Sequence, residues 1–246
     1  SDDQFGYALD VSGDSLTLAV SAPNAESVYV YKNTSGTFNL TQTITGADSR
    51  FGESISLSDT ADYLAISSIL VDGAEIDQGA VLVYKNVNGS FVSYQSLKNI
   101  MPEAAEHFGS KISFMNDYRS IVVYSTAADT YVPTTFDLNT TIFDDNLTKI
   151  TARHVNSGRV DIYDRYINNW IYSESLITSN VELDGYGVSV TVGSNHIFVG
   201  APYANDSGYK AGRIYEYSKP AGTYSWNILH EEVKKPDLNK IKTSLS

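Results

Sequence analysis

The chain has no cysteine and no long apolar segment among its 246 residues. Without cysteine there can be no disulfide, no thiolate metal ligand and no cysteine nucleophile. A membrane-spanning helix needs about 20 consecutive apolar residues. No run in this sequence approaches that length. The sequence therefore predicts no membrane insertion.

Basic residues are scarce. There are 17 Lys and Arg against 29 Asp and Glu, which gives a formal net charge of −12 at pH 7. A surface this acidic repels the phosphate backbone of nucleic acids. We therefore expect no nucleic-acid partner, and we look to proteins or glycans as ligands.

Aromatic residues are plentiful by contrast, with 18 Tyr and 9 Phe. Together with the many Val, Ile and Thr residues, they favour β structure. Hydrophobic residues make up 42% of the chain, which is enough to form a core. The composition therefore indicates a β-rich globular protein.

An aromatic-glycine pair opens each of four similar units. An alternating strand, an apolar strand with small residues at its end, a Val- and Tyr-rich strand and a weaker fourth strand follow each pair. The pairs begin 46, 57 and 78 residues apart, at Phe5-Gly6, Phe51-Gly52, Phe108-Gly109 and Tyr186-Gly187. Four-stranded repeats with a period near 50 residues are typical of propeller blades.

We therefore predict an all-β fold, a β-propeller of four recognisable four-stranded blades within residues 1–230. The polar, Lys-rich residues 231–246 would be a tail or a linker. Glycine beside the aromatic would let the innermost strand approach its neighbour, where a Cβ would clash, and the aromatic would pack between blades. The predicted blades span residues 5–44, 51–97, 108–176 and 186–229.

The fourth unit carries the fullest motif, with Tyr186-Gly187, then Gly200-Ala201-Pro202, then Gly212-Arg213-Ile214-Tyr215. This pattern resembles the FG-GAP repeats of integrin α-subunit propellers. Propellers of that family usually have seven blades. The resemblance therefore implies either a closed four-bladed ring or part of a larger seven-bladed ring, and the start at Ser1, almost on the first motif, favours the larger ring.

Integrin-type repeats often carry a calcium loop between their first and second strands. The corresponding turns here, such as Ser12-Gly13-Asp14 and Asn116-Asp117, lack oxygen ligands at alternate positions. We therefore expect no calcium, no other metal and no cofactor.

A second resemblance concerns the C-terminal tail: Trp226 and the segment from Lys235 to Lys242 are similar to parts of virion structural proteins of tailed marine phages. It implies an extracellular or virion location and other virion proteins as partners.

The predicted topology sorts the loops onto two faces. Turns after the first and third strands would carry basic residues, whereas connections after the second and fourth strands would carry acidic ones, including Glu106. The second face would also bear an insert over residues 127–156, and it corresponds to the ligand face of integrins. The candidate binding residues are Asp72, Glu75, Asp77, Tyr131, Asp137, Asp144, Asp145, Tyr203, Asp206 and Tyr209.

These features favour a non-catalytic binding, adhesion or scaffolding module that recognises a protein or a glycan. Two alternatives stay open: a glycan-active enzyme with a site at the propeller channel, and a calcium-dependent adhesin. Two carboxylates about 5–10 Å apart in a pocket would favour the enzyme. Nothing in the sequence marks a nucleophile elbow or a catalytic residue.

Overall fold

The computed structural model describes residues 2–47, 50–100, 102, 104–115, 119–126, 128, 130–133, 150–154, 158–177, 185–204, 212–219 and 226–230. These residues form four antiparallel four-stranded sheets, as the sequence predicts. The first sheet contains β1 (Leu9–Val11), β2 (Thr17–Ala22), β3 (Ser27–Thr34) and β4 (Thr37–Thr45). The second contains β5 (Phe51–Leu57), β6 (Tyr63–Ser68), β7 (Ala80–Val87) and β8 (Ser90–Leu97). The third contains β9 (Phe108–Phe114), β10 (Ser120–Ser125), β13 (Arg159–Tyr166) and β14 (Asn169–Leu176). The fourth contains β15 (Ser189–Val192), β16 (His196–Ala201), β17 (Arg213–Ser218) and β18 (Asn227–His230).

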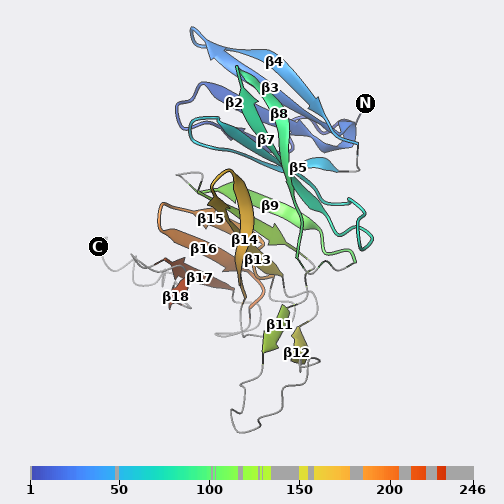
Figure 1. Cartoon of the computed structure of the whole chain (residues 1–246), viewed down its shortest axis with the longest axis vertical. Coiled ribbons are helices and arrows are strands. Elements are labelled where there is room, and N and C mark those ends of the chain that lie inside the picture. The colour runs from blue at the N-terminus through green and yellow to red at the C-terminus, as the bar shows by residue number, and fades with distance from the viewer. Residues whose placement is uncertain are drawn as a thin grey trace, which may run out of the picture.

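The four sheets follow one another from one end of the molecule to the other (Figure 1). The first and fourth sheets lie at opposite ends of this row, so the described residues form an open arc in place of a closed four-bladed ring. A single 3₁₀ turn, Pro23–Ala25, connects β2 to β3.

The insert in the third unit contains a hairpin of its own. We expected a loop over residues 127–156, but β11 (Thr130–Pro133) pairs with β12 (Ile150–His154) in a separate two-stranded sheet. This hairpin projects from the third sheet (Figure 1).

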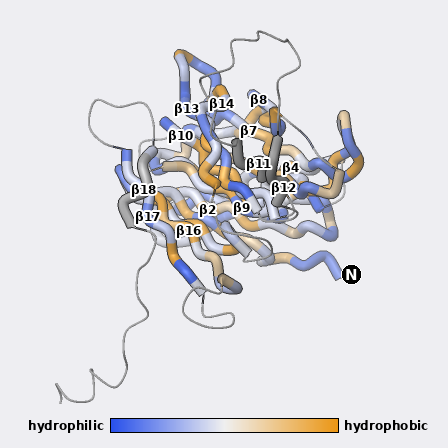
Figure 2. Tube along the Cα trace, turned by 90° about the horizontal axis from the view of Figure 1, so that it is seen from below, coloured by the Kyte–Doolittle hydropathy of each residue, from blue (hydrophilic) through white to orange (hydrophobic). Residues whose placement is uncertain are grey.

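The core lies between neighbouring sheets, because both faces of the central strands are covered. Every residue of β6 and of β10 is buried. One cluster joins the first and second sheets through Phe51, Ile55 and Val28, and two further clusters join the later pairs of sheets. Figure 2 shows apolar segments running along the strands inside the molecule and hydrophilic segments at many of the outer turns.

Glycine in the aromatic-glycine pair meets two requirements of this packing. Gly52 and Gly109 have φ values of +91° and +96°, in the left-handed region that side chains disfavour. A Cβ at either position would also lie 2.9 Å from the Cβ of a serine in the preceding sheet, Ser21 or Ser67. The predicted close approach of the inner strand is therefore confirmed.

A glutamine clamp links the outer strands of adjacent sheets. The side-chain amide of Gln42 accepts the backbone N–H of Phe91 at 2.8 Å and donates to its carbonyl at 2.7 Å. Gln95 makes the same two bonds with Trp170 one sheet later. Each clamp fixes the spacing between two sheets at the periphery, as the aromatic-glycine pair does at the inner strand.

Candidate functional site

The connection between β6 and β7 presents three of the predicted binding residues in one loop. We call residues 71–79 the acidic loop. Asp72 and Glu75 are exposed and Asp77 is half-buried. Ile76, between two of these acids, is 69% exposed. An exposed apolar side chain flanked by carboxylates suits a mixed contact with a partner.

Internal hydrogen bonds hold the acidic loop in shape. Asp72 Oδ1 accepts the backbone N–H of Asp77 at 3.0 Å, and Gln78 Oε1 accepts that of Glu75 at 3.1 Å. The chain passes close to the buried Gln78 amide, because a Cβ at Gly73 would lie 2.2 Å from its Nε2 atom. The backbone conformation is thus set before any partner arrives, which reduces the entropy lost on binding.

The segment that precedes β9 anchors the acidic loop to the third sheet. The carbonyls of Ile76 and Gln78 accept backbone N–H groups of Ala105 and Phe108, at 2.8 Å and 2.9 Å. Asp77 itself has a φ of +51°, an uncommon conformation for aspartate. The loop therefore belongs to the junction between two sheets and does not hang from one of them.

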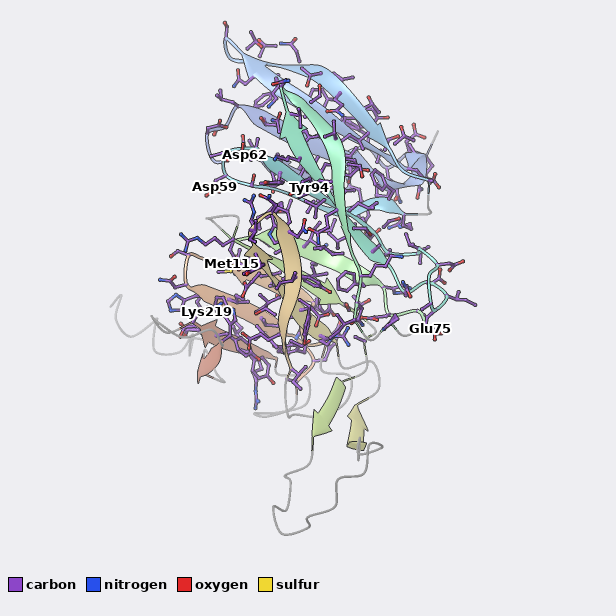
Figure 3. The ribbon with its side chains drawn as sticks, viewed as in Figure 1. Asp59, Asp62, Glu75, Tyr94, Met115 and Lys219 are labelled. Atoms are coloured by element: carbon purple, nitrogen blue, oxygen red, sulfur yellow. The ribbon has the colours of Figure 1, made fainter. Side chains whose placement is uncertain are left out.

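The connections on either side of β6 lie at two opposite edges of the second sheet, as the topology predicts. Figure 3 shows Glu75 at the opposite edge of the second sheet from Asp59 and Asp62, which lie on the same side of the molecule as Lys219. The expected separation of charge is weaker than the sequence suggested. The edge with the basic residues also carries these carboxylates, and Lys219 pairs with Asp164 at 3.1 Å.

A buried charge network begins in the segment that contacts the acidic loop, and it corrects one prediction. Glu106 is fully buried and does not contribute to an exposed acidic face. Its carboxylate pairs with Arg159 Nη2 at 2.6 Å, and Arg159 Nε pairs with Asp161 at 2.9 Å. Asn99 donates to both oxygens of Glu106. Buried charges persist only when they are paired and hydrogen-bonded, and here each of them is.

Burial raises the pKa of Asp161, and the charge of Arg159 opposes this shift. The same burial, reinforced by the charge of Asp161, raises the pKa of the Tyr163 hydroxyl. Asp161 and Glu106 share one guanidinium in the interior, at 1% and 0% exposure. The network ties the connection before β9 to β13, and both of its carboxylates are buried.

A small pocket lies between the inner strands of the third and fourth sheets. The described residues that line it are mostly apolar, and they include one charged side chain, that of Lys111, and no carboxylate. Among the described residues, no group of three or more His, Cys, Asp or Glu is placed to hold a metal ion. The described part of the chain also contains no helix that is long and apolar enough to span a membrane.

The structure brings together only part of the predicted site. Asp72, Glu75 and Asp77 share the acidic loop, whereas Tyr203 follows β16 in the fourth sheet, where it is exposed. Tyr131 lies in β11, and its side chain is outside the described part of the structure. The other predicted residues lie outside the described residues: Asp137, Asp144, Asp145, Asp206 and Tyr209.

Sequence reasoning missed the buried charge network, although a signal was present. Asp161 lies in the predicted Val- and Tyr-rich strand of the third unit, and Arg159 directly precedes that strand at an alternate position, so both side chains point to one face. Opposite charges at such positions in a buried strand predict an ion pair. The third member, Glu106, comes from a connection 53 residues away, and no local pattern reveals it.

No protein-family model matches the chain, and no curated protein matches its sequence. Solved structures do match. A Bacteroides uniformis protein assigned as a 6-phosphogluconolactonase aligns at a TM-score of 0.57 and 10% identity, over 91% of this chain and 53% of its own. The periplasmic gluconolactonase of Pseudomonas aeruginosa aligns at 0.54 and 12% identity, over 91% and 53%. The WD40 repeats of RRP9 align at 0.52 and 12% identity, over 92% and 52%.

These likenesses show a propeller-like fold. The chain spans about half the length of the solved structures it matches. Proteins of quite different kinds share this fold, so the likeness carries no activity with it.

Proposed function

We propose that this chain is a non-catalytic binding or scaffolding module built from FG-GAP-type blades, and that the face bearing its acidic loop recognises a protein or a glycan. The observation that carries the proposal is the acidic loop. It combines exposed carboxylates, an exposed Ile76 and a backbone fixed by hydrogen bonds to two sheets. Because the backbone of the loop is already ordered, little further conformational entropy is lost when a partner binds.

The sign of the charge favours a basic or hydroxyl-rich ligand. Asp72 and Glu75 add negative potential to a chain whose formal net charge is −12. A basic protein patch would be attracted over long range, and carboxylates also accept hydrogen bonds from sugar hydroxyls. The insert of the third unit lies in the connection after the second strand, as the acidic loop does in the second unit, and it would extend the contact surface.

The tail resemblance favours a virion component as the setting of this module. The partner would then be a host-surface protein or glycan, or a neighbouring virion protein. An extracellular or virion location follows from the same resemblance.

Two exposed isoleucines give a matched test. Ile76 lies in the acidic loop, whereas Ile167, which is 77% exposed, lies in the turn between β13 and β14. We expect Ile76→Ser and Glu75→Lys to abolish retention of the protein on a glycan array or on intact bacterial cells. Ile167→Ser should leave retention unchanged. Equal binding by all variants would contradict a role for the acidic loop, and deleting residues 130–153 tests the insert separately.

A lactone hydrolase is the second candidate to test: two of the matched structures carry that assignment, although the shared fold does not by itself carry the activity. It is tested directly by offering the purified chain gluconolactone and its 6-phospho derivative and following ring opening. Turnover well above the spontaneous rate would replace the binding proposal with an enzymatic one.

A calcium-dependent adhesin is tested by calorimetric titration with calcium. A flat trace would rule out this alternative.

A further inference from the structure

The two ends of the arc expose surfaces that are buried at the junctions between the first, second and third sheets. At the first sheet, Phe5, Leu9 and Val11 are 59%, 67% and 46% exposed. We call these residues the head face. The equivalent residues of the second and third sheets lie against the preceding sheet, and each is 9% exposed or less: Phe51, Ile55, Leu57, Phe108, Ile112 and Phe114.

The opposite end exposes the surface that such a strand normally covers. We call Phe198, Gly200 and Ile214, on β16 and β17, the tail face. Strand register makes Ile214 equivalent to Val28 and Val81, because it pairs with Gly200 as they pair with Ser21 and Ser67. Val28 and Val81 are fully buried, whereas Ile214 is 39% exposed.

The glycines repeat this contrast. A Cβ at Gly79 would lie 2.4 Å from the carbonyl oxygen of Phe108, which belongs to the next sheet. Gly212 is the equivalent glycine of the fourth sheet, and a Cβ there would have as its nearest described neighbour the carbonyl oxygen of Pro202, directly after β16, at 3.3 Å. Gly6, the glycine of the first aromatic-glycine pair, has nothing within 4 Å. Both ends thus have the shape of a sheet-to-sheet junction that no described residue completes.

We propose that a second copy of this chain completes both junctions. The head face of each copy packs on the tail face of the other, and two arcs of four sheets close a ring of eight. The junction would repeat the one already formed by Gly52 on Ser21 and Val28. Rings of four to eight blades are the usual range for propellers. A head-to-tail contact that closes on its second copy forms a discrete dimer.

Energetics favour covering these faces. Terminal units of repeat proteins normally have polar outer faces, because an apolar outer face favours association. The head face is apolar at Phe5, Leu9 and Val11. The tail face is bordered by His196 and Glu216. Their Nε2 and Oε1 atoms lie 3.7 Å apart, so these polar groups have each other as partners.

Sedimentation velocity of the 246-residue chain over a wide concentration range tests the proposal. We expect a concentration-dependent species of twice the 26.9 kDa mass of one chain. A chain that stays monomeric throughout would overturn the second copy as occupant. Growth beyond two chains would overturn the closed ring, because an open head-to-tail contact produces filaments.

A charge exchange tests which faces meet. Leu9→Lys on the head face and Ile214→Glu on the tail face should each give only monomers, since each places an unpaired charge in both junctions. Mixing the two variants should restore the dimer, because one junction is then wild-type and the other pairs lysine with glutamate. Restoration also shows that both variants are folded. Folded variants that stay monomeric when mixed, or an Ile214→Glu variant that still dimerises alone, would overturn the head-to-tail arrangement.

The acidic loop provides the control for this experiment. Ile76→Ser lies on the edge of the arc, away from both faces, so it should leave the dimer unchanged. The result is independent of the proposed function, because mass is measured and ligand binding is not. If both hold, each dimer presents two acidic loops and gains avidity for a multivalent surface.

Discussion

The first and second sheets have the same sequence pattern and opposite surroundings at their inner strands. Phe5 and Phe51 both precede a glycine with φ near +90°, yet Phe5 is 59% exposed and Phe51 is fully buried. The residue before each of them, Gln4 or Arg50, also has a left-handed backbone. The motif therefore sets the local conformation of the strand, and the burial of its aromatic depends on whether another sheet lies against it.

The largest contrast between a fully buried contact and the junction of the first two sheets concerns ion pairs. Replacing Arg159 by Met leaves Glu106 and Asp161 buried without their counter-charge. Removing one partner of a buried pair costs about 3–5 kcal/mol. Arg50 pairs with Glu53 where the side chains are 28% and 14% exposed, so the charge left behind is partly solvated and Arg50→Met should cost less, about 1–2 kcal/mol. Urea unfolding of both variants measures the difference, and equal costs would show that the buried network contributes no more than a partly exposed pair.

The next contrast concerns the two phenylalanines themselves. Phe51→Ala should lower the free energy of unfolding by about 3–5 kcal/mol, because it leaves a cavity between two sheets. Phe5 contacts Tyr29 edge-on at 5.4 Å but is largely exposed, so Phe5→Ala should cost about 1 kcal/mol or less. The unfolding free energies of both variants are measured at protein concentrations low enough for sedimentation to show only monomers. A large cost at Phe5 in the monomer would mean that the head face is already covered within one chain.

Local patterns predict the strands and their turns, because alternation and glycine act within a few residues. The pair Phe51-Gly52 is enough to predict a strand that approaches its neighbour, and the φ of +91° at Gly52 agrees. Contacts between sheets are harder to predict, since their partners are distant in the sequence. Nothing around Gln95 indicates that its amide clamps Trp170, 75 residues later.

The candidate site shows the same limit. The acidic residues of the loop between β6 and β7 can be read from the sequence, and the structure places Asp72, Glu75 and Asp77 together. Glu106 looks equally available in the sequence but is buried against Arg159. Exposure of a carboxylate depends on a partner that is distant in the sequence, here 53 residues away, and composition does not reveal that partner.

Glycine substitutions separate backbone strain from steric contact. Gly6 and Gly109 have similar φ values, +90° and +96°, so an alanine at either position carries the same left-handed strain of about 1–2 kcal/mol. At Gly109 the new Cβ would also lie 2.9 Å from Ser67 and 3.0 Å from Val81. Gly109→Ala should therefore cost about 1–3 kcal/mol more than Gly6→Ala in monomeric protein. Equal thermal stabilities would show that the sheets can move apart to admit a methyl group.

The smallest effects should come from two carboxylates that tie the outer sheets to the inner ones. Burial on its own would raise the pKa of Asp164, but hydrogen bonds from Ser120, Ser173 and Lys219 hold it below the ordinary value. Burial raises the pKa of Asp10, despite hydrogen bonds from the N–H groups of Leu57 and Val11. The two groups should therefore affect stability with opposite signs as the pH changes.

For Asp164 the unfolded chain binds the proton more tightly, so its contribution to stability is present above pH of about 4 and is lost as the pH falls through the folded pKa. For Asp10 the folded chain binds the proton more tightly, so stability decreases as the pH rises from about 4 through the folded pKa. Unfolding free energies of Asp164→Asn and Asp10→Asn, measured from pH 3 to pH 7 against wild type, should each lose one of these slopes. If both variants changed the pH dependence of the unfolding free energy in the same direction, the opposite pKa shifts of Asp164 and Asp10 would be contradicted.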